Sequence, residues 1–127
     1  MRIVKTTANH QDERGEIRDI LTHQSVDAVT YITCRAGSVR ANHYHKFSVQ
    51  YTYVLRGGFD AYSQQGEDGT TRESHRVTVG DLVIHEAGEA HAFRALEDGE
   101  ILSLTMGPRN GEDYEKDTYR LKEKMVE

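Results

Sequence analysis

Two histidines separated by one residue, His43 and His45, form the most chemically suggestive pair in the chain. If the backbone around them is extended, both imidazoles project from one face, because successive side chains of a β-strand alternate between its two faces. A third histidine, His91, closes a second glycine-punctuated stretch that begins at Gly80. The central functional prediction is that these two stretches pack together and bring the three imidazoles into one site.

Three converging imidazoles and one oxygen donor suit a divalent transition metal, such as Mn, Fe, Co, Ni or Zn. The predicted ligands are His43, His45, His91 and, as the oxygen donor, Gln50. A neutral glutamine lacks the charge of a carboxylate, so it weakens the attraction for a divalent ion. The alternative is a hydrogen-bonded polar cavity without metal. His43 cannot serve both designs, because a coordinated imidazole cannot accept a substrate proton.

The distribution of charge indicates the kind of ligand. The net charge of −5 argues against a nucleic-acid surface, which normally carries a basic face. Residues 28–58 contain no Asp or Glu, although the chain has 21 acids, and this segment holds Arg35, Arg40, Lys46 and Arg56. One interpretation is a pocket for an anionic small molecule such as a phosphate or carboxylate. The other is that these basic side chains lie at strand ends on the surface.

The composition also constrains location and cofactors. The single cysteine, Cys34, allows no intrachain disulfide, and the first residues lack the apolar run of a signal peptide. No apolar segment approaches the length of a membrane span. We therefore expect a soluble, cytoplasmic protein without a membrane partner. No phosphate loop, paired-cysteine motif or Ser-His-Asp order occurs, so no nucleotide cofactor is expected.

The elements that must position these residues are short β-strands. Runs of β-branched and aromatic residues separated by glycines predict strands at 1–7, 16–22, 28–34, 39–45, 49–55, 59–64, 72–79, 82–85, 91–95 and 101–106. The strands at 59–64 and 72–79 should pair as a hairpin across the polar loop 66–70. Acids early and lysines late predict a helix at 113–124. The pattern favours an all-β sandwich or barrel in one domain.

The strand that carries Gln50 predicts how the chain associates. If Gln50 faces the histidines, Thr52 and Val54 share its face, while Tyr51 and Tyr53 point outward. The outer face is then the more apolar one, which predicts a homodimer packed through this sheet. The alternative places the two tyrosines in the core and removes Gln50 from the site.

The two glycine-punctuated stretches resemble the two motifs of the cupin superfamily. The first cupin motif is matched by Gly37, His43, His45 and Gly57, with Gln50 in the place of the family's glutamate. The second is matched by Gly80, Gly88 and His91, with Glu86 and Ala95 in the places of a proline and an asparagine. The resemblance implies a single-domain cupin, a double-stranded β-helix or jelly-roll barrel, over residues 1–127. We expect the barrel core at about 16–107 and a helical tail at 112–127.

Within the cupins, three segments are similar to the nucleotide-sugar branch of 3,5-epimerases and 3,4-ketoisomerases. They are an Asp-X-Arg-Gly element at 12–15, an Arg-X-X-His-Tyr segment at 40–44 and the closing stretch 113–120, which also resembles sugar-cluster cupins. By this resemblance, His43 would be the base that removes a proton next to a sugar ketone, and Arg40 would hold the diphosphate. Strict alternation puts Arg40 and His43 on opposite faces of a strand, so a bend or bulge between them is required.

Further candidates carry less specific signals. Tyr44 and Tyr53 are candidate substrate-binding residues, and with Tyr31 they could offer a phenol as acid; the alternative is that all three are packing residues. His85 precedes the second motif and could approach the site, although a structural role at a strand end is the favoured interpretation.

Three functions therefore stay open at the level of sequence. The first is an isomerase or epimerase of a nucleotide-linked keto-sugar, in which His43 and Arg40 are central. The second is a metal-dependent cupin oxygenase or lyase that acts on a small carboxylate or enediol. The third is a non-catalytic cupin that binds a metal or an anionic, sugar-type ligand.

Overall fold

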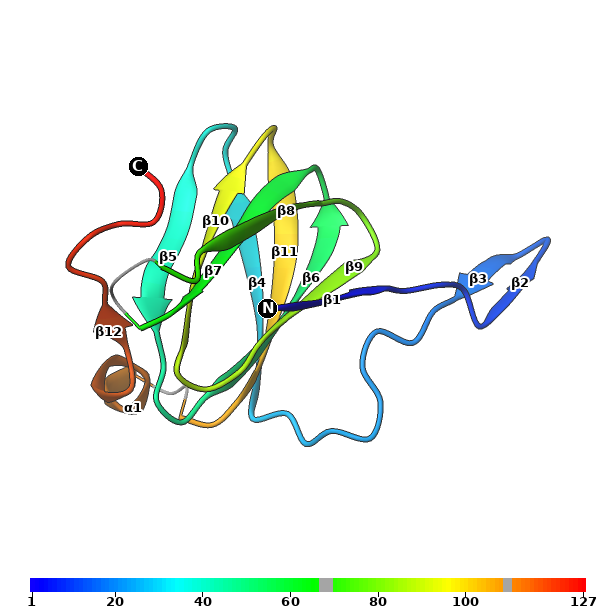
Figure 1. Cartoon of the computed structure of the whole chain (residues 1–127). Coiled ribbons are helices and arrows are strands. Elements are labelled where there is room, and N and C mark those ends of the chain that lie inside the picture. The colour runs from blue at the N-terminus through cyan, green and yellow to red at the C-terminus, as the bar shows by residue number, and fades with distance from the viewer. Residues whose placement is uncertain (67–69, 109–110) are drawn as a thin grey trace.

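The computed structural model describes residues 1–66, 70–108 and 111–127. Over these residues, the strands form two five-stranded antiparallel sheets that face each other and a separate two-stranded hairpin (Figure 1). The order of the first sheet is β1 (Arg2–Lys5), β9 (Asp81–His85), β6 (Val49–Arg56), β11 (Gly99–Met106) and β4 (Ala28–Cys34). The order of the second is β12 (Tyr119–Arg120), β5 (Val39–Tyr44), β10 (Glu89–Ala95), β7 (Phe59–Gln65) and β8 (Glu73–Val77). The predicted all-β fold is confirmed.

Most strands lie where the sequence predicts them. The run at Ala28–Cys34 is β4, and the strands from β5 to β11 begin and end within about two residues of their predicted limits. The predicted hairpin is present, because β7 and β8 pair antiparallel with Phe59 opposite Val77. Residues 67–69 of the predicted loop lie outside the described residues. Alternating β-branched and aromatic residues therefore locate these strands well.

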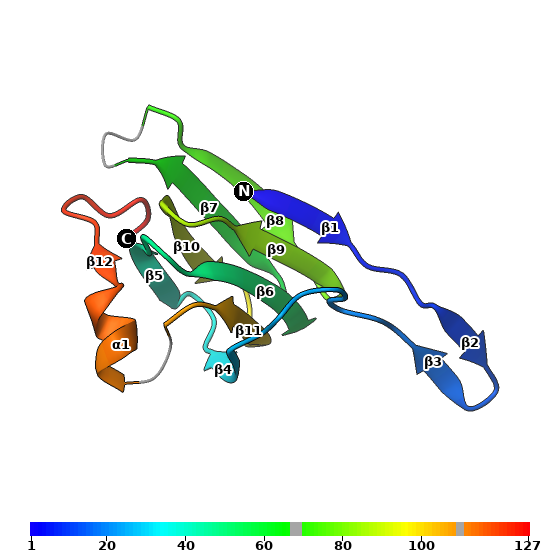
Figure 2. The same ribbon diagram turned by 90° about the horizontal axis from the view of Figure 1, so that it is seen from below.

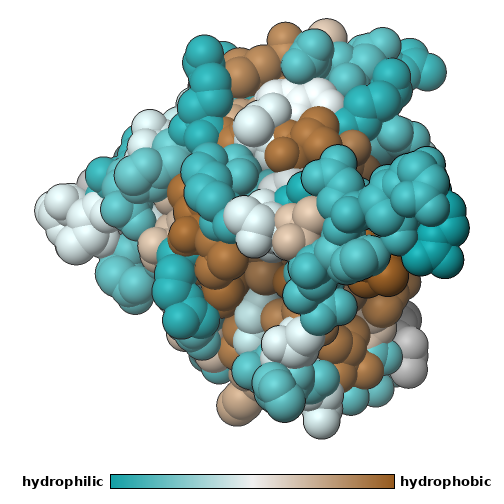
Figure 3. Space-filling view, turned by 90° about the vertical axis from the view of Figure 1, so that its right-hand side faces the viewer, coloured by the Kyte–Doolittle hydropathy of each residue, from teal (hydrophilic) through white to brown (hydrophobic). Residues whose placement is uncertain are grey.

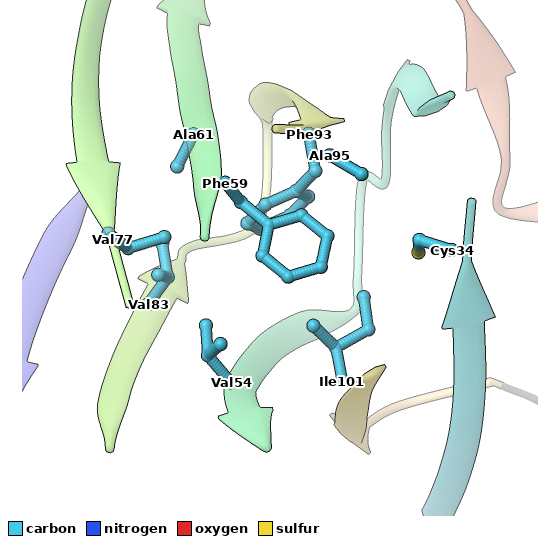
Figure 4. Close-up of a cluster of buried hydrophobic side chains, with 9 residues drawn as sticks. All are labelled: Cys34, Val54, Phe59, Ala61, Val77, Val83, Phe93, Ala95 and Ile101. Atoms are coloured by element: carbon cyan, nitrogen blue, oxygen red, sulfur yellow. The ribbon is translucent and has the colours of Figure 1, made fainter. Parts of the chain in front are cut away.

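One end of the barrel interior is filled with apolar side chains. Phe59 is fully buried at the centre of this cluster (Figure 4). Around it lie Cys34, Val54, Ala61, Val77, Val83, Phe93, Ala95 and Ile101. The packing is close: a Cβ added to Gly99 would lie 2.7 Å from the Phe59 ring. This end therefore supplies the hydrophobic stabilisation inside the barrel, in addition to that of the apolar clusters on the outer faces of the two sheets.

The strand β6 presents its polar face to the interior. Gln50 and Thr52 line an internal cavity and Val54 joins the apolar cluster, whereas Tyr51 and Tyr53 lie on the outer face of the sheet. There they pack with Leu82 and Ile84, and partly buried neighbours extend the group: Ile20, Leu21, Val49, Leu55, Leu102, Leu104 and Met106. Figure 3 shows hydrophobic surface between hydrophilic side chains on one side of the molecule. The predicted orientation of this strand is confirmed.

The segment at 16–22 differs from its predicted strand. Only β3 (Gly15–Ile17) forms there, and it pairs with β2 (His10–Asp12) in a hairpin that projects away from the barrel (Figure 2). After Ile17 the chain leaves the hairpin, and Arg18 Nη1 donates a hydrogen bond to the Thr6 carbonyl oxygen at 2.5 Å. At the chain start, β1 belongs to the first sheet, so the barrel begins before residue 16.

The C-terminal helix is shorter than predicted. The helix α1 covers Gly111–Lys116, and the chain then forms β12, which pairs with β5 (Figure 1). Beyond β12, Leu121 and Met125 are buried against Ala90 and Ala92 on the outer face of the second sheet. Packing against the barrel therefore replaces the helix that the charge pattern favours. Among the described residues, no helix has the length and apolar character needed to cross a membrane.

Candidate active site

The two histidine stretches meet in the second sheet. β10 pairs antiparallel with β5, which places His91 opposite His43. The Gly88 amide donates a hydrogen bond to the His45 carbonyl oxygen at 2.6 Å, so the turn of the second motif is joined to the end of the first. Ring centroids lie 4.7 Å apart for His43 and His45, 4.8 Å for His43 and His91, and 5.4 Å for His45 and His91. The predicted convergence of the three imidazoles is confirmed.

A backbone irregularity in β5 brings Arg40 and His43 to the same cavity. Ala41 and Asn42 adopt positive φ angles of 76° and 58°, and the pairing with β10 shifts register between His91 and Ala92. This is the bend that strict alternation requires, since without it the two side chains would lie on opposite faces. Both side chains line the cavity.

The cavity at this end of the barrel has a volume of about 300 Å³. Its polar lining is cationic and neutral: of the described residues that line it, none is acidic. It is lined by Ile32, Arg40, Ala41, His43, Gln50, Thr52, His91, Phe93, Ile101, Ser103, Tyr114 and Arg120. Cationic side chains without an acid suit an anionic group on a ligand.

Backbone carbonyls fix the tautomers of two imidazoles. His45 Nδ1 lies 2.9 Å from the Asp117 carbonyl oxygen, and His91 Nδ1 lies 3.2 Å from the Glu89 carbonyl oxygen. Because a carbonyl oxygen only accepts, each Nδ1 carries a proton, and the neutral form of each ring is then the Nδ1–H tautomer. His91 Nε2 is buried and has no hydrogen-bond partner among the described residues. Burial, and secondarily the nearby His45, lower the pKa of His91 to about 3, so its ring is neutral at pH 7.

The nitrogens of the three histidines predicted as metal ligands lie close enough together to hold a metal ion. One ring nitrogen from each of His43, His45 and His91 lies within 4.8 Å of the others. Gln50 also reaches the cavity, where its amide nitrogen donates to Ser103 Oγ at 3.3 Å. Three imidazoles are a ligand set for Mn, Fe, Co, Ni or Zn. Metal binding, and Gln50 as its oxygen ligand, stay predictions.

His85 extends the group of imidazoles to a fourth ring. It stacks on His91 with centroids 4.7 Å apart and meets Phe93 edge-on at 5.7 Å. It is 1% exposed and does not line the cavity, so it lies between the cavity and the apolar end. Burial lowers the pKa of His85 well below its ordinary value, and His91 adds to this shift. The placement agrees with the favoured structural interpretation.

The predicted tyrosines lie away from the cavity, and two other residues line it instead. Tyr53 is buried on the outer face of the first sheet, Tyr31 is exposed on β4, and Tyr44 stacks on Tyr119 at 5.2 Å. None of these three lines the cavity. Contact of Tyr44 or Tyr53 with a ligand stays a prediction. A phenol and a second guanidinium come from Tyr114 and Arg120 of the C-terminal segment. Because Arg120 is the register partner of His43, its position follows from the pairing of β12 with β5.

The Asp-X-Arg-Gly element lies on the projecting hairpin. Arg14 Nη2 bonds Asp12 Oδ2 at 2.7 Å, and this guanidinium lowers the pKa of the Asp12 carboxyl to about 2. The hairpin extends from the opposite side of the barrel to α1 and does not contribute to the lining of the cavity (Figure 1). Within one chain, the structure therefore does not bring this element to the imidazoles.

The architecture is shared with solved structures of an epimerase and of 3,4-ketoisomerases, one of them a sugar 3,4-ketoisomerase. An RmlC epimerase from Mycobacterium tuberculosis has a TM-score of 0.78 at 19% identity, covering 93% of this chain and 66% of that chain. A 3,4-ketoisomerase from Helicobacter canadensis has a TM-score of 0.78 at 17% identity, covering 94% of this chain and 89% of that chain. The QdtA 3,4-ketoisomerase from Thermoanaerobacterium thermosaccharolyticum, in complex with TDP, has a TM-score of 0.77 at 16% identity, covering 95% of this chain and 88% of that chain.

The chain has the cupin-type jelly-roll fold. No protein-family model and no curated protein sequence matches it. The chain spans about two thirds of the length of the RmlC epimerase that it resembles, and most of the length of the two ketoisomerases. In this fold, the predicted histidine motifs lie on adjacent, paired strands at one end of the barrel.

Proposed function

We propose that the protein is an isomerase or epimerase of a nucleotide-linked keto-sugar. The observation that carries the proposal is the cavity, in which a half-buried imidazole, His43, and a guanidinium, Arg40, meet with no acid among the described lining residues. Solved structures of sugar epimerases and ketoisomerases share this fold. The proposal assigns the keto-sugar to the imidazoles and the anionic nucleotide diphosphate to the arginines.

His43 acts as the general base in this proposal. It accepts the proton from the carbon next to the sugar ketone, and the electrons of the broken C–H bond move to the carbonyl oxygen as an enolate. His91 is neutral at pH 7 because burial lowers its pKa to about 3, so no charged imidazole at that position opposes protonation of His43. Tyr114 brings an O–H group to the same cavity, where it can donate to the enolate oxygen. Epimerisation is completed when a donor other than His43 delivers a proton to the opposite face of the same carbon. Isomerisation is completed when the enolate oxygen gains a proton, the neighbouring hydroxyl loses its own to become the new carbonyl, and His43 returns its proton to the former carbonyl carbon.

Deuterium exchange tests this proposal directly. The protein is incubated in D₂O with a nucleotide-linked 4-keto sugar, and label in the sugar is followed by mass spectrometry. We expect exchange in the wild type and its loss in His43→Asn, by about a hundredfold or more. His23→Asn is the matched control, because His23 is exposed and has a φ of 58°, which asparagine tolerates. Exchange that survives in His43→Asn would falsify the assignment of the base.

A metal-dependent activity is the second candidate, favoured by the three imidazole nitrogens within 4.8 Å of one another. When bound, such a metal supplies Lewis-acid polarisation of a carbonyl or enediol. His43, His45 and His91 would hold it, and His43 would then be unable to act as a base. Elemental analysis of untagged protein purified without chelator separates the candidates, since stoichiometric Fe, Mn, Ni, Co or Zn favours this one over general-base catalysis by His43.

We also propose that the protein is a homodimer that packs through the outer face of its first sheet. Val29 is 62% exposed and Tyr31 is 56% exposed on β4, and the apolar outer residues of β11 and then β6 follow across the sheet. Such a continuous apolar face is typical of an interface. Val29→Lys should reduce the mass measured by light scattering from that of two chains to that of one, whereas Val79→Lys, at an exposed valine outside these strands, should not. A wild-type mass of one chain excludes the dimer.

A further inference from the structure

A buried carboxylate joins the C-terminal segment to the end of the first histidine motif. Asp117 follows α1 directly and is 3% exposed. Its carboxylate accepts hydrogen bonds from three successive backbone amides, those of Lys46 at 2.9 Å, Phe47 at 3.2 Å and Ser48 at 3.0 Å. Ser48 Oγ donates a fourth, at 2.9 Å. An acceptor with four donors from one turn holds that turn in a single conformation.

The same residue also contacts His45 through its backbone. The Asp117 carbonyl oxygen accepts the Nδ1 proton of His45 at 2.9 Å. His45 immediately precedes the turn that the carboxylate holds, so the side chain and the backbone of Asp117 act on neighbouring residues. If the turn moves, the Nδ1-to-carbonyl contact is lost, because the two interactions share one short segment of chain on each side.

The second buried imidazole is held in the same way. His91 Nδ1 bonds the carbonyl oxygen of Glu89, which is 5% exposed, and Glu89 Oε1 accepts the Glu86 amide at 3.2 Å. In both cases the carboxylate of a buried acid fastens a turn, and its carbonyl orients an imidazole. The two arrangements use different segments, since Asp117 comes from the C-terminal end and Glu89 from β10.

We infer that Asp117 is a positioning residue, which fixes the ring of His45 in its Nδ1-protonated tautomer beside His43 and His91. One ring nitrogen from each of these three histidines lies within 4.8 Å of the others. The orientation that Asp117 gives to His45 therefore decides how this ring meets the other two imidazoles.

Nitrogen NMR of the metal-free protein tests the inference. With ¹⁵N-labelled histidine at pH 7, two-bond ¹H–¹⁵N spectra report which ring nitrogen carries the proton, and His45→Gln assigns the signal. In the wild type we expect His45 protonated on Nδ1. In Asp117→Asn the amide presents an NH₂ group in place of one acceptor oxygen. We expect loss of the single tautomer and Nδ1 proton exchange about ten- to a hundredfold faster, the range set by a lost charged hydrogen bond.

Two controls distinguish positioning from general stability. Asp113→Asn changes an exposed acid of α1 and should leave the His45 signal unchanged. His91 is the internal control within each variant, because its ring is held by Glu89 and not by Asp117. A variant that is only less stable would disturb both rings. The inference requires a change at His45 alone. Ser48→Ala removes one donor and covers the case in which Asp117→Asn does not fold. It should speed exchange at His45 severalfold and leave His91 unaltered.

The outcomes are separable from those of the proposed function, because no substrate is used. A wild-type His45 protonated on Nε2 overturns the inference, as does an unchanged His45 signal in folded Asp117→Asn or in Ser48→Ala. Equal changes at His45 and His91 assign Asp117 a general structural role and also overturn it. Deuterium exchange into the keto-sugar can succeed or fail independently of each of these results.

Discussion

The two ends of the barrel interior are built on the same strands but from different side chains. Along β10, inward His91 is followed by Phe93, and along β9, His85 is preceded by Val83. Along β6, Gln50 and Thr52 give way to Val54, and along β11, Thr105 and Ser103 give way to Ile101. Each strand thus changes from polar to apolar at the same level of the barrel.

This difference separates the tasks of stability and chemistry. The apolar end buries closely packed side chains, which is the main favourable contribution to folding. The imidazole end buries polar groups, which is unfavourable wherever they lack partners. Because both ends share each strand, the rigid packing of one end fixes the strands that carry the other. We therefore expect substitutions at the two ends to affect stability in different, and in some cases opposite, ways.

The largest effect is expected at the apolar end. Phe59→Ala removes a fully buried ring from the centre of the cluster and should lower the free energy of unfolding by about 3–5 kcal/mol. Urea titration followed by circular dichroism measures the change. Ser103→Ala at the imidazole end is the comparison and should cost about 1 kcal/mol or less. Similar losses in the two variants would contradict the division between the ends.

Acid should destabilise the metal-free protein through the imidazole end. The pKa of His91 is about 3 in the folded state, against an ordinary value of 6.5, so below pH 6.5 the unfolded chain binds a proton that the folded chain does not. The free energy of unfolding should therefore fall, by about 1.4 kcal/mol per pH unit, as the pH drops from 6.5 toward 3. His85, whose pKa is also lowered by burial, acts in the same direction.

The contribution of His91 is isolated by substitution. His91→Gln should show a shallower loss of stability between pH 6 and pH 4 than the wild type in urea titrations at each pH. His23→Gln, at an exposed histidine, should keep the wild-type slope. Identical slopes in all three proteins would mean that His91 is not held neutral by burial.

The sequence predicts the strands and the imidazole cluster because both depend on local patterns. The alternation that places His43 and His45 on one face and Gln50 inward is a property of each strand alone. A glycine of the first motif has a local reason too, because Gly57 has a φ of 82°, which a residue without a Cβ adopts readily. Motif spacing then supplies the one long-range relation that the prediction needs, the pairing of β5 with β10.

The C-terminal contribution could not be predicted because it depends on contacts between distant segments. Residues 113–124 have a helical charge pattern, but the chain stops the helix at Lys116 so that Asp117 can accept the amides of the turn at 46–48. Those bonds span 69 to 71 residues. No local signal marks them, so Tyr114 and Arg120 could not be assigned to the cavity from the sequence. The predicted strand at 16–22 fails similarly, since Arg18 bonds Thr6 across the base of the hairpin.

A gain of stability is expected when a polar group at the imidazole end is removed. Thr105 is fully buried, and its Oγ1 has no hydrogen-bond partner among the described residues. Thr105→Val keeps the shape of the side chain and removes that hydroxyl, so it should raise the free energy of unfolding by about 1 kcal/mol. Thr118→Val is the matched control and should lower stability, because Thr118 Oγ1 donates to the Tyr114 carbonyl oxygen at 2.6 Å. A loss of stability in both variants would contradict the unfavourable burial of Thr105.

The smallest expected effect concerns the backbone of the imidazole end. Ala41 has a φ of 76°, a conformation that disfavours every side chain with a Cβ, and the same bend turns Arg40 and His43 toward one cavity. Ala41→Gly should therefore raise the free energy of unfolding by about 0.5–1 kcal/mol in urea titrations. Ala28→Gly, in regular β4, should lower it by a similar amount. If Ala41→Gly lowers the free energy of unfolding instead, the bend at Ala41 is not strained. Backbone strain would then not be a difference between the imidazole end and the apolar end of the barrel.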